Sequence, residues 1–399
     1  MSDRASKNRE AEEALRIVSD FLQEARLDSP VHLHEPLIDE GIRETIAGTL
    51  ASGFVSSVGP TVARFESALA SFCGTEFAVC TSSGTSALQL ALKIHDVQPG
   101  DHVAVPALSF IATANAVTFL GAVPVFLDSV DIDLDTSMGL SAYSLELLLR
   151  SYVKTDGKPV HRHSGAALAC IIPMHTLGRL VDLEEIQKIA TEWNLPIIED
   201  AAEALGSFDR SGLHSGATNT AVLSFNGNKI ITTGGGGAVV TNSADLAAKA
   251  KHLSTTAKVP HSWAYSHDEV GWNFRMPAIN AALGLGQLNS MKRILMAKDE
   301  LLARYRNAFF ASEFFEIVEN PTNQKSNNWL IAIRLKKPDT DTLHSVLDAL
   351  HQEGFLCRPL WDLLPTQPPY STNFSTPTPN AEKLRGSVIC LPSSPGLAT

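Results

Sequence analysis

The chain lacks the features that mark a membrane or nucleic-acid-binding protein. No apolar run in its 399 residues reaches the ~20 residues that a membrane-spanning helix requires. The N-terminal sequence MSDRASKNREAEEAL has no apolar segment of the kind that a signal peptide carries. A formal net charge of -11 disfavours binding to nucleic acid or to anionic lipid. We therefore expect a cytoplasmic protein with no membrane and no nucleic-acid partner.

Cysteine is scarce, and its spacing suggests neither a metal site nor a disulfide framework. The five cysteines are odd in number and scattered along the chain. Most of them lie in apolar runs, which predicts buried free thiols in a reducing compartment. An apolar fraction of 44% and a charged fraction of 19% are those of a soluble globular protein.

Strand-like and helix-like segments alternate through the middle of the chain, which predicts an α/β fold with a mostly parallel sheet. The segments read as strands are residues 102–106, 123–128, 167–174 and 195–200, and those read as helices are residues 110–120 and 182–193. Asp182 and Glu185 form a capping-box-like pattern at the start of the second helix. In such sheets ligands bind at the carboxyl ends of the strands, so the residues after each strand are the candidates for a site.

The two ends of the chain read differently from this centre. Residues 9–27 place apolar side chains three and four positions apart, which predicts an amphipathic helix. The last hundred residues read as a smaller unit, and the boundary falls near residues 285–295. We expect an N-terminal helical segment over 1–50, a large domain over 51–290 and a small C-terminal domain over 291–399.

Lys229 stands in an unusual stretch of sequence. It lies between the strand-like run 221–225 and the four consecutive glycines 234–237. Glycines let the backbone approach a ligand closely, and a lysine held against such a surface is partly desolvated. Desolvation lowers the pKa of an amine toward the nucleophilic form that a Schiff-base lysine needs. A surface lysine beside a flexible loop would give the same pattern.

Two further stretches suggest a site for an anionic, nitrogen-containing ring. Ser83-Gly84-Thr85-Ser86 lies between a predicted strand and a predicted helix, where unpaired N–H groups suit a phosphate. An ordinary helix N-cap would also explain these residues. Asp200 ends an apolar strand and is followed by small residues, so its carboxylate could hold a protonated ring nitrogen in a dry site. A helix N-cap aspartate is the alternative reading.

A lysine nucleophile, a ring-nitrogen carboxylate and a phosphate cradle are the three fixed points of a pyridoxal phosphate site. Six ordered segments add detail: Gly59-Pro60 with Phe65-Glu66, residues 83–88, residues 173–178, residues 199–203, Ser224-Phe225 with Lys229, and residues 271–276. Together they resemble the DegT-type (DegT/DnrJ/StrS) nucleotide-sugar aminotransferases. This resemblance implies a fold-type I, aspartate aminotransferase-like enzyme that uses pyridoxal 5'-phosphate.

The amino-acid sequences of residues 225–237 and 255–261 resemble those of a narrower branch of this family, the C4 aminotransferases of legionaminic acid and bacillosamine-type pathways. That resemblance implies a nucleotide-linked substrate, which we take to be a UDP-linked 4-keto-6-deoxy-N-acetylhexosamine, and glutamate as amino donor.

The same resemblance assigns roles to individual residues. Lys229 would form the Schiff base and then carry the proton between substrate and cofactor. Asp200 would keep the ring nitrogen protonated. Gly84, Thr85 and Ser224 would hold the phosphate.

Other roles implied by the resemblance have plain structural alternatives. Phe110 would stack on the cofactor or be a core residue, and Glu203 would lie near its phenolic oxygen. Asn273 would reach the phosphate of the neighbouring subunit, which implies a homodimer with shared sites. His175 would line the substrate site or support the turn after its strand. Four cations would bind the diphosphate or be structural or solvated charges: Lys258, His261, Arg275 and Arg358.

Three rival functions fit the same residues less well. A sugar dehydratase of this fold replaces the lysine with histidine, so Lys229 argues against it. A 3-keto-sugar aminotransferase would share every catalytic residue and differ only in its substrate pocket. A non-catalytic pyridoxal phosphate-binding regulator remains, although no helix-turn-helix is apparent.

Overall fold

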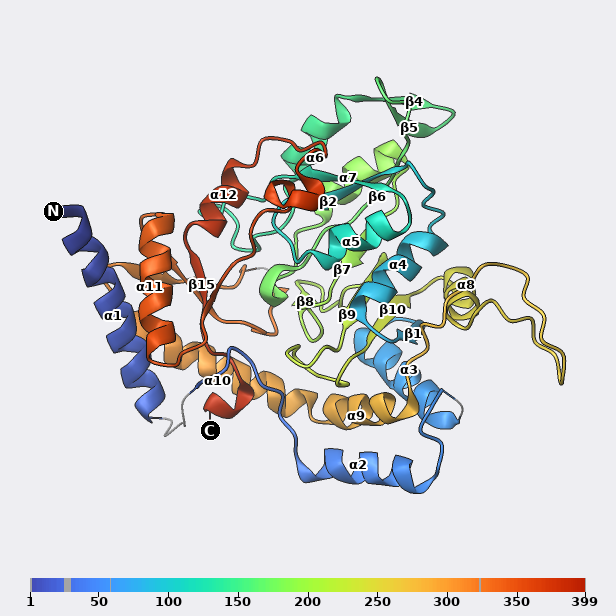
Figure 1. The fold of residues 1–399 in the computed structure, drawn as a ribbon, viewed down its shortest axis with the longest axis horizontal. Helices are drawn as coiled ribbons and strands as arrows, with labels where there is room; N and C mark the ends of the chain where they lie inside the picture. Colours follow the sequence, from blue (N-terminus) through green and yellow to red (C-terminus); the bar gives the residue numbers. More distant parts are fainter. Residues whose placement is uncertain (1, 25–29, 58, 323, 399) are drawn as a thin grey trace.

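A seven-stranded sheet forms the centre of the computed structural model, which describes residues 2–24, 30–57, 59–322 and 324–398 (Figure 1). Four strands in the order β1-β10-β9-β7 continue into three in the order β6-β2-β3. The isolated parallel bridges Ile171–Ile197 and Met174–Asp200 join the two groups. The strands are β1 (Phe77–Thr81), β10 (Gly237–Thr241), β9 (Thr220–Ser224), β7 (Ile198–Asp200), β6 (Leu168–Ile171), β2 (His102–Pro106) and β3 (Val123–Leu127).

The predicted mostly parallel sheet is confirmed, with one exception. Strand β10 runs antiparallel to both of its neighbours, β1 and β9. The other neighbouring strands of the sheet pair in parallel. The reason is the connection from β9 to β10, which turns back directly through residues 225–236 without a crossover helix. This hairpin connection carries Lys229, so the lysine sits at the carboxyl end of the parallel strands.

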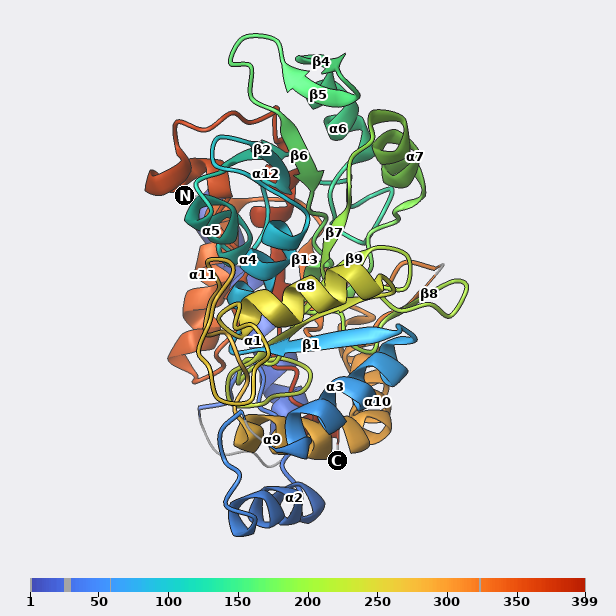
Figure 2. The same cartoon turned by 90° about the vertical axis from the view of Figure 1, so that its right-hand side faces the viewer.

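Helices pack against this sheet at several places. Helices α4 and α8 lie on β1 and β10, and α3 contacts β1 and α9 (Figure 2). The helices of this part are α3 (Pro60–Cys73), α4 (Gly84–Ile94), α5 (Ala112–Phe119), α6 (Ala142–Leu149), α7 (Glu184–Trp193), α8 (Ala244–Ser254) and α9 (Ala278–Asn289). A hairpin β4 (Tyr152–Thr155) and β5 (Lys158–His161), the short strand β8 (Phe208–Asp209) and the 3-10 turn η1 (Thr176–Gly178) complete it.

The predicted helix starts differ from the observed ones by a few residues. The helix expected over 110–120 begins at Ala112, and the one expected from Asp182 begins at Glu184. The expected capping box is wrong, because Leu183 occupies the N-cap position without a side-chain hydrogen bond. Asp182 instead accepts a hydrogen bond from Glu184 N at 3.0 Å, within the turn that precedes the helix.

A second apolar cluster joins the N-terminal helix to the C-terminal part of the chain. Phe21 of α1 stacks on Tyr305 of α10 with ring centroids 4.1 Å apart. Helix α1 ends at Glu24, so residues 25–27 of the predicted amphipathic helix lie outside the described residues. The helices here are α1 (Ser2–Glu24), α2 (Glu40–Ala51), α10 (Met291–Phe309), α11 (Thr340–Gln352) and α12 (Pro379–Arg385).

An antiparallel sheet accompanies these helices, in the order β11-β13-β15-β14. Its strands are β11 (Phe315–Ile317), β13 (Ala332–Leu335), β15 (Val388–Cys390) and β14 (Arg358–Pro359). Strand β12 (Gln324–Lys325) pairs with β8, and the 3-10 turns η2 (Leu364–Thr366), η3 (Pro368–Tyr370) and η4 (Pro395–Ala398) lie farther along the chain. No helix of the described ranges is long and apolar enough to cross a membrane.

One close helix contact supports the hairpin that carries Lys229. A Cβ placed on Gly284 of α9 would lie 2.5 Å from Phe65 Cζ of α3, so only glycine lets the helix approach this ring. Phe65 in turn meets Phe225 edge to face, with ring centroids 5.4 Å apart. Phe225 directly follows β9, so the packing of α9 on α3 sets the base of the hairpin.

We predict that Gly284→Ala lowers the free energy of unfolding by about 1–3 kcal/mol, because the added methyl must displace the Phe65 ring. Gly48→Ala in α2 is the matched control. A Cβ at Gly48 meets no atom within 4 Å, so this change should be neutral or stabilise by about 0.5–1 kcal/mol. Chemical denaturation of both variants measures the difference. Equal stability of the two would show that the Phe65 ring yields freely.

Candidate active site

The largest concentration of predicted site residues lies around a cavity of about 710 Å³ at the carboxyl ends of the parallel strands. The hairpin between β9 and β10, the first turn of α4 and segments near residues 329 and 360 enclose it. Eight residues expected at the site line this cavity: Gly84, Thr85, Phe110, Asp200, Glu203, Ser224, Lys229 and Arg358. Residues far apart in the sequence therefore converge on one space.

Lys229 is held between a carboxylate and an aromatic ring. Its Nζ lies 3.0 Å from Glu203 Oε1 and 4.1 Å from the centroid of the Trp329 ring, and its side chain is 13% exposed. Trp329 Nε1 donates a hydrogen bond to Asn228 O at 2.7 Å, which fixes the indole against the residue before the lysine. The ammonium thus has one ionic and one cation–π partner at the wall of the cavity.

Asp200 is buried at the end of β7 with limited compensation for its charge. Thr113 Oγ1 donates to its Oδ2 at 2.7 Å, and Ala202 N donates to its Oδ1 at 3.2 Å. Burial raises the pKa of Asp200, while these hydrogen bonds and the charge of Lys229 lower it by less. A carboxyl group in this state gains from a cationic N–H placed beside it.

Glu203 is the second buried acid of the cavity. Its Oε2 accepts a hydrogen bond from Leu177 N at 2.8 Å, and its other oxygen accepts from Lys229. Burial raises the pKa of Glu203, and Lys229 lowers it in part. The two acids and the lysine therefore form one electrostatically linked group.

The first turn of α4 faces the other end of the cavity. Ser83 is its N-cap and accepts from Ser86 N at 3.0 Å, which leaves the N–H groups of Gly84 and Thr85 directed outward. A Cβ on Gly84 would lie 2.9 Å from Ser224 Cβ, and one on Gly237 would lie 2.5 Å from Ser83 O. Glycine at both positions keeps the backbones close enough to form a cradle of a size that suits a phosphate.

These residues fit pyridoxal phosphate at three points. The α4 turn with Ser224 would hold its phosphate, Asp200 would face its ring nitrogen, and Lys229 would bind its aldehyde carbon. Phe110 lines the same space and is 51% exposed, which leaves its ring face free for stacking.

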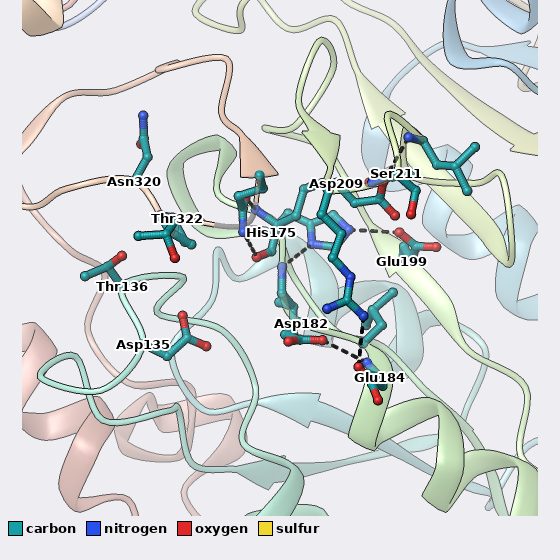
Figure 3. A pocket seen from close by; sticks show the side chains of 18 of the residues that line it. Asp135, Thr136, His175, Asp182, Glu184, Glu199, Asp209, Ser211, Asn320 and Thr322 are labelled. Atoms are coloured by element: carbon teal, nitrogen blue, oxygen red, sulfur yellow. Dashed lines mark hydrogen bonds and ion pairs between the residues drawn. The ribbon is translucent and has the colours of Figure 1, made fainter.

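His175 lies away from the cavity around Lys229. Met174 lines that cavity, whereas His175, the next residue in the turn after β6, lines a different one of about 670 Å³ (Figure 3). Val181 N donates to His175 Nδ1 at 3.0 Å, so Nε2 carries the proton that is donated to Glu199 Oε2 at 2.9 Å. Among the described residues, His175 therefore lines this second cavity, and its hydrogen bonds with Val181 N and Glu199 support the turn after β6. Its role at the substrate site stays a prediction.

Glu199 is the partner that fixes this histidine. Burial by itself would raise the pKa of Glu199, but hydrogen bonds from His175, Asn219 and Gly216 lower it below its ordinary value. Glu199 and Asp200 are neighbours that face opposite sides of the strand. One carboxylate therefore anchors the structure while the other is left for a ligand.

Four predicted residues lie outside the cavity, on the segment between α8 and α9. Among the described residues, Asn273 accepts from Arg275 Nε at 2.8 Å, and Lys258 Nζ lies 4.3 Å from the centroid of the Tyr265 ring. His261 Nδ1 accepts from Ala264 N at 2.9 Å. Residues 258–270 project away from the rest of the chain (the yellow loop after α8 in Figure 1). A single chain does not bring these four to its own cavity.

Sequence reasoning missed several residues of the cavity wall. Thr113 follows Phe110 by one turn and carried no local signal, because its importance comes from its contact with Asp200. Trp329 precedes β13, which begins at Ala332, and its place in the cavity wall comes from the folded chain. Leu33 lies before the predicted large domain of residues 51–290. It becomes part of the cavity wall only when the chain folds.

Comparison with known proteins places the chain in context. The sequence profile of the DegT/DnrJ/EryC1/StrS aminotransferase family matches residues 36–399. A GDP-perosamine synthase of Caulobacter vibrioides is 33% identical over 365 residues, which cover 91% of this chain and 92% of the relative. A UDP-4-amino-4-deoxy-L-arabinose--oxoglutarate aminotransferase of Shewanella sediminis is 31% identical over 75% of this chain and 74% of its own length.

The fold has a solved counterpart in the Helicobacter pylori aminotransferase PseC, which is involved in the biosynthesis of pseudoaminic acid. The two superpose with a TM-score of 0.81 at 26% identity, over 91% of this chain and 93% of PseC. The predicted fold-type I architecture is thereby confirmed.

We predict opposite effects of Asp200→Asn on the cofactor-free protein and on cofactor binding. A raised folded pKa means that ionised Asp200 costs stability, and this cost develops as pH rises from the ordinary pKa of aspartate to the raised one. At about pH 7 the cofactor-free variant should therefore be more stable than wild type by about 1–2 kcal/mol, and this gain should be lost as pH falls through the raised pKa of Asp200. It should also bind pyridoxal phosphate more weakly, because the partner for the ring nitrogen is neutral.

Thermal unfolding with and without cofactor, across pH, measures both effects. Destabilisation of the cofactor-free variant would show that the Asp200 charge is already compensated in the protein itself.

Proposed function

The chain belongs to the DegT/DnrJ/EryC1/StrS aminotransferase family, and from that premise we propose its substrate and the roles of its residues. The protein is a pyridoxal phosphate-dependent nucleotide-sugar aminotransferase. We propose that its acceptor is a UDP-linked 4-keto-6-deoxy-N-acetylhexosamine and its amino donor glutamate, in surface-polysaccharide or nonulosonic acid and bacillosamine-type biosynthesis. The convergence of Lys229, Asp200 and the α4 turn on one cavity is the observation that carries the proposal.

Support for the acceptor comes from two sources. The amino-acid sequences of residues 225–237 and 255–261 resemble those of the C4 aminotransferases named above. The Shewanella relative's name places its amino group at C4 of a UDP-linked sugar. The Caulobacter relative's name carries GDP, so the nucleotide is the part of the proposal that an acceptor series must decide.

The chain's own residues divide the chemistry. When bound, pyridoxal phosphate supplies an electron sink for the carbon that loses a proton. Asp200 keeps the ring nitrogen protonated, Gly84, Thr85 and Ser224 hold the phosphate, and Lys229 Nζ moves the proton to and from the substrate carbon.

Glu203 and Trp329 hold Lys229 Nζ at the inner wall of the cavity, 3.0 Å from Glu203 Oε1 and 4.1 Å from the ring centroid. The lysine therefore stays aimed at the reacting carbon while it is not covalently bound. Glu203 Oε1 is also positioned to take a proton from the lysine, which would leave the amine in its reactive form.

We also propose that the active unit is a homodimer. Residues 258–270 project from the body, and Trp263 and Tyr265 on this segment are 80% and 84% exposed. Asn273 at the base of the same segment lies outside its own chain's cavity, as expected of a residue that acts in the partner's site. The division of the chain near residue 290 and its cytoplasmic location remain proposals alongside this one.

Lys229→Ala should abolish transamination, because it removes both the attachment point for the cofactor and the group that moves the proton. The expected loss is at least about 10⁴-fold in kcat. The cofactor-free variant should still fold, but at a lower unfolding temperature than wild type, because buried Glu203 loses its ionic partner. Absorbance spectra and single-turnover kinetics measure this. Undiminished turnover would exclude Lys229 as the catalytic lysine.

Wild-type enzyme, first treated with glutamate, should then react with a UDP-linked 4-keto-6-deoxy-N-acetyl sugar and return to its starting spectrum. Recovery only with a GDP-linked sugar, or only with a 3-keto isomer, would reject the proposed acceptor and keep the aminotransferase chemistry.

A shared site predicts complementation between two inactive variants. Mixing Lys229→Ala with Asn273→Ala under conditions of subunit exchange should restore about a quarter of wild-type activity, since half of the dimers are mixed and each has one intact site. The activity of each variant measured alone is the control for the mixture. Absence of recovery in mixtures whose exchange is verified by mass would place Asn273 outside the partner's site.

A further inference from the structure

A smaller cavity of about 180 Å³ adjoins the cofactor cavity. The two share Leu33, Asn228, Trp329, Leu330 and Arg358 in their walls. Asn228 is bonded in sequence to Lys229, and the Trp329 ring lies 4.1 Å from Lys229 Nζ. The small cavity therefore lies next to Lys229, the proposed catalytic lysine.

The N-terminal segment supplies one wall of this cavity. Val31 pairs with the segment that leads into β14, through hydrogen bonds from Val31 N to Gly354 O at 2.9 Å and from Leu356 N to Val31 O at 3.0 Å. Ser393 N donates to Leu33 O at 2.7 Å on the opposite side. These backbone bonds fix His32 and His34 beside Arg358.

Nitrogen donors dominate the lining. Arg358, His32 and His34 line the cavity, and no Asp or Glu of the described chain does. The Arg358 guanidinium is exposed, and its Nη1 lies 3.3 Å from Cys357 O and 3.0 Å from His351 Nε2. A cation flanked by imidazoles, with no acid in the wall, is complementary to a small anion.

His34 forms the buried part of this wall. It is 7% exposed, and neither ring nitrogen has a hydrogen-bond partner among the described residues. Burial, with the nearby charges of Lys298 and Lys229, holds the pKa of His34 well below its ordinary value. The ring is therefore neutral at physiological pH, with one N–H to donate. Buried polar groups without a partner are costly, which points to a ligand group that satisfies this one.

We propose that this cavity is the subsite for the α-carboxylate of the amino donor, with Arg358 as its charged partner and His34 as a neutral donor at its floor. The inference rests on the proposed aminotransferase function and deepens it. In an α-amino acid the carboxylate is bonded to the same carbon as the reacting amine. Its subsite must therefore adjoin Lys229, as this cavity does.

A sugar diphosphate fits this position less well. In a 4-keto nucleotide sugar the whole sugar ring separates the reacting carbon from the diphosphate, so the phosphates must lie farther from Lys229. The cavity of about 180 Å³ is large enough for a carboxylate with a short carbon chain. The structure thus assigns Arg358 to the donor and not to the diphosphate that we expected from the sequence.

The experiment separates the two half-reactions. Arg358→Gln and Arg358→Lys are compared with Arg162→Gln, an exposed arginine on the distant β4–β5 hairpin whose Nε donates to Arg150 O. Stopped-flow absorbance follows the reaction of each holoenzyme with glutamate, and then of its amino form with the keto sugar. Calorimetry measures the binding of glutarate, a dicarboxylate that cannot react, to the same holoenzymes.

Arg358→Gln should raise the glutamate concentration for half-maximal rate and the glutarate Kd by about 10- to 100-fold, the usual worth of a charge-assisted hydrogen bond. For Arg358→Lys both values should lie between those of wild type and of Arg358→Gln, because lysine keeps the charge and loses the bidentate geometry of the guanidinium. Arg162→Gln should match wild type. His34→Leu, with its unfolding temperature checked, should weaken glutarate binding by several-fold, because leucine has no N–H to donate.

Two outcomes would overturn the proposal. Unchanged glutamate and glutarate binding in Arg358→Gln would remove Arg358 from the donor site. A slowed keto-sugar half-reaction with an intact glutamate half-reaction would return Arg358 to the diphosphate. If wild type reacts with glutamate but with no keto sugar, the proposed acceptor fails while the donor subsite is still tested by the first half-reaction.

Discussion

The contact between the largely buried Lys229 Nζ and Glu203 Oε1, 3.0 Å apart, is the interaction around which the site is arranged. Asp200 lies in the same group, and burial raises the pKa of both acids. Two buried carboxylates with one lysine leave a shortage of positive charge. In the proposed site, a cofactor with a protonated ring nitrogen would supply that charge at Asp200 and so complete an arrangement that the protein leaves incomplete.

The C-terminal part of the chain reaches this group through a short polar segment. Asn327 Nδ2 donates to Glu203 O at 2.7 Å, and its Oδ1 accepts from Trp329 N at 2.8 Å. Lys298, fully buried and with a pKa held low by burial, donates to Trp329 O at 2.8 Å. The ring that faces Lys229 is thus held by α10 and by the loop after β7 together, and a shift of either would move it.

Most of the framework could be predicted because it depends on local patterns. The alternation of strands and helices gave the parallel sheet, and glycine beside Lys229 and Ser83 marked two close backbone approaches. The position of His175 could not be read in this way, since the turn that places Met174 at one cavity and His175 at another is formed only in the folded chain. Thr113 and Trp329 act only through contacts that folding creates, and Leu33 and His34 enter the site through an edge pairing with residues 354–356.

The two faces at Glu199–Asp200 explain how one strand end serves both stability and chemistry. Glu199 receives hydrogen bonds from His175 and Asn219, which lower its pKa and tie β7 to the turn after β6 and to the residue before β9. Asp200, one residue later, faces a cavity where its partners only partly offset burial. Had both acids been fully paired, the strand would be more stable and Asp200 would have little to gain from a cationic ring. The hydrogen bonds of Glu199 therefore stabilise the strand end, and Asp200 can keep a charge that is only partly compensated. A site for a cationic ring requires such a carboxylate.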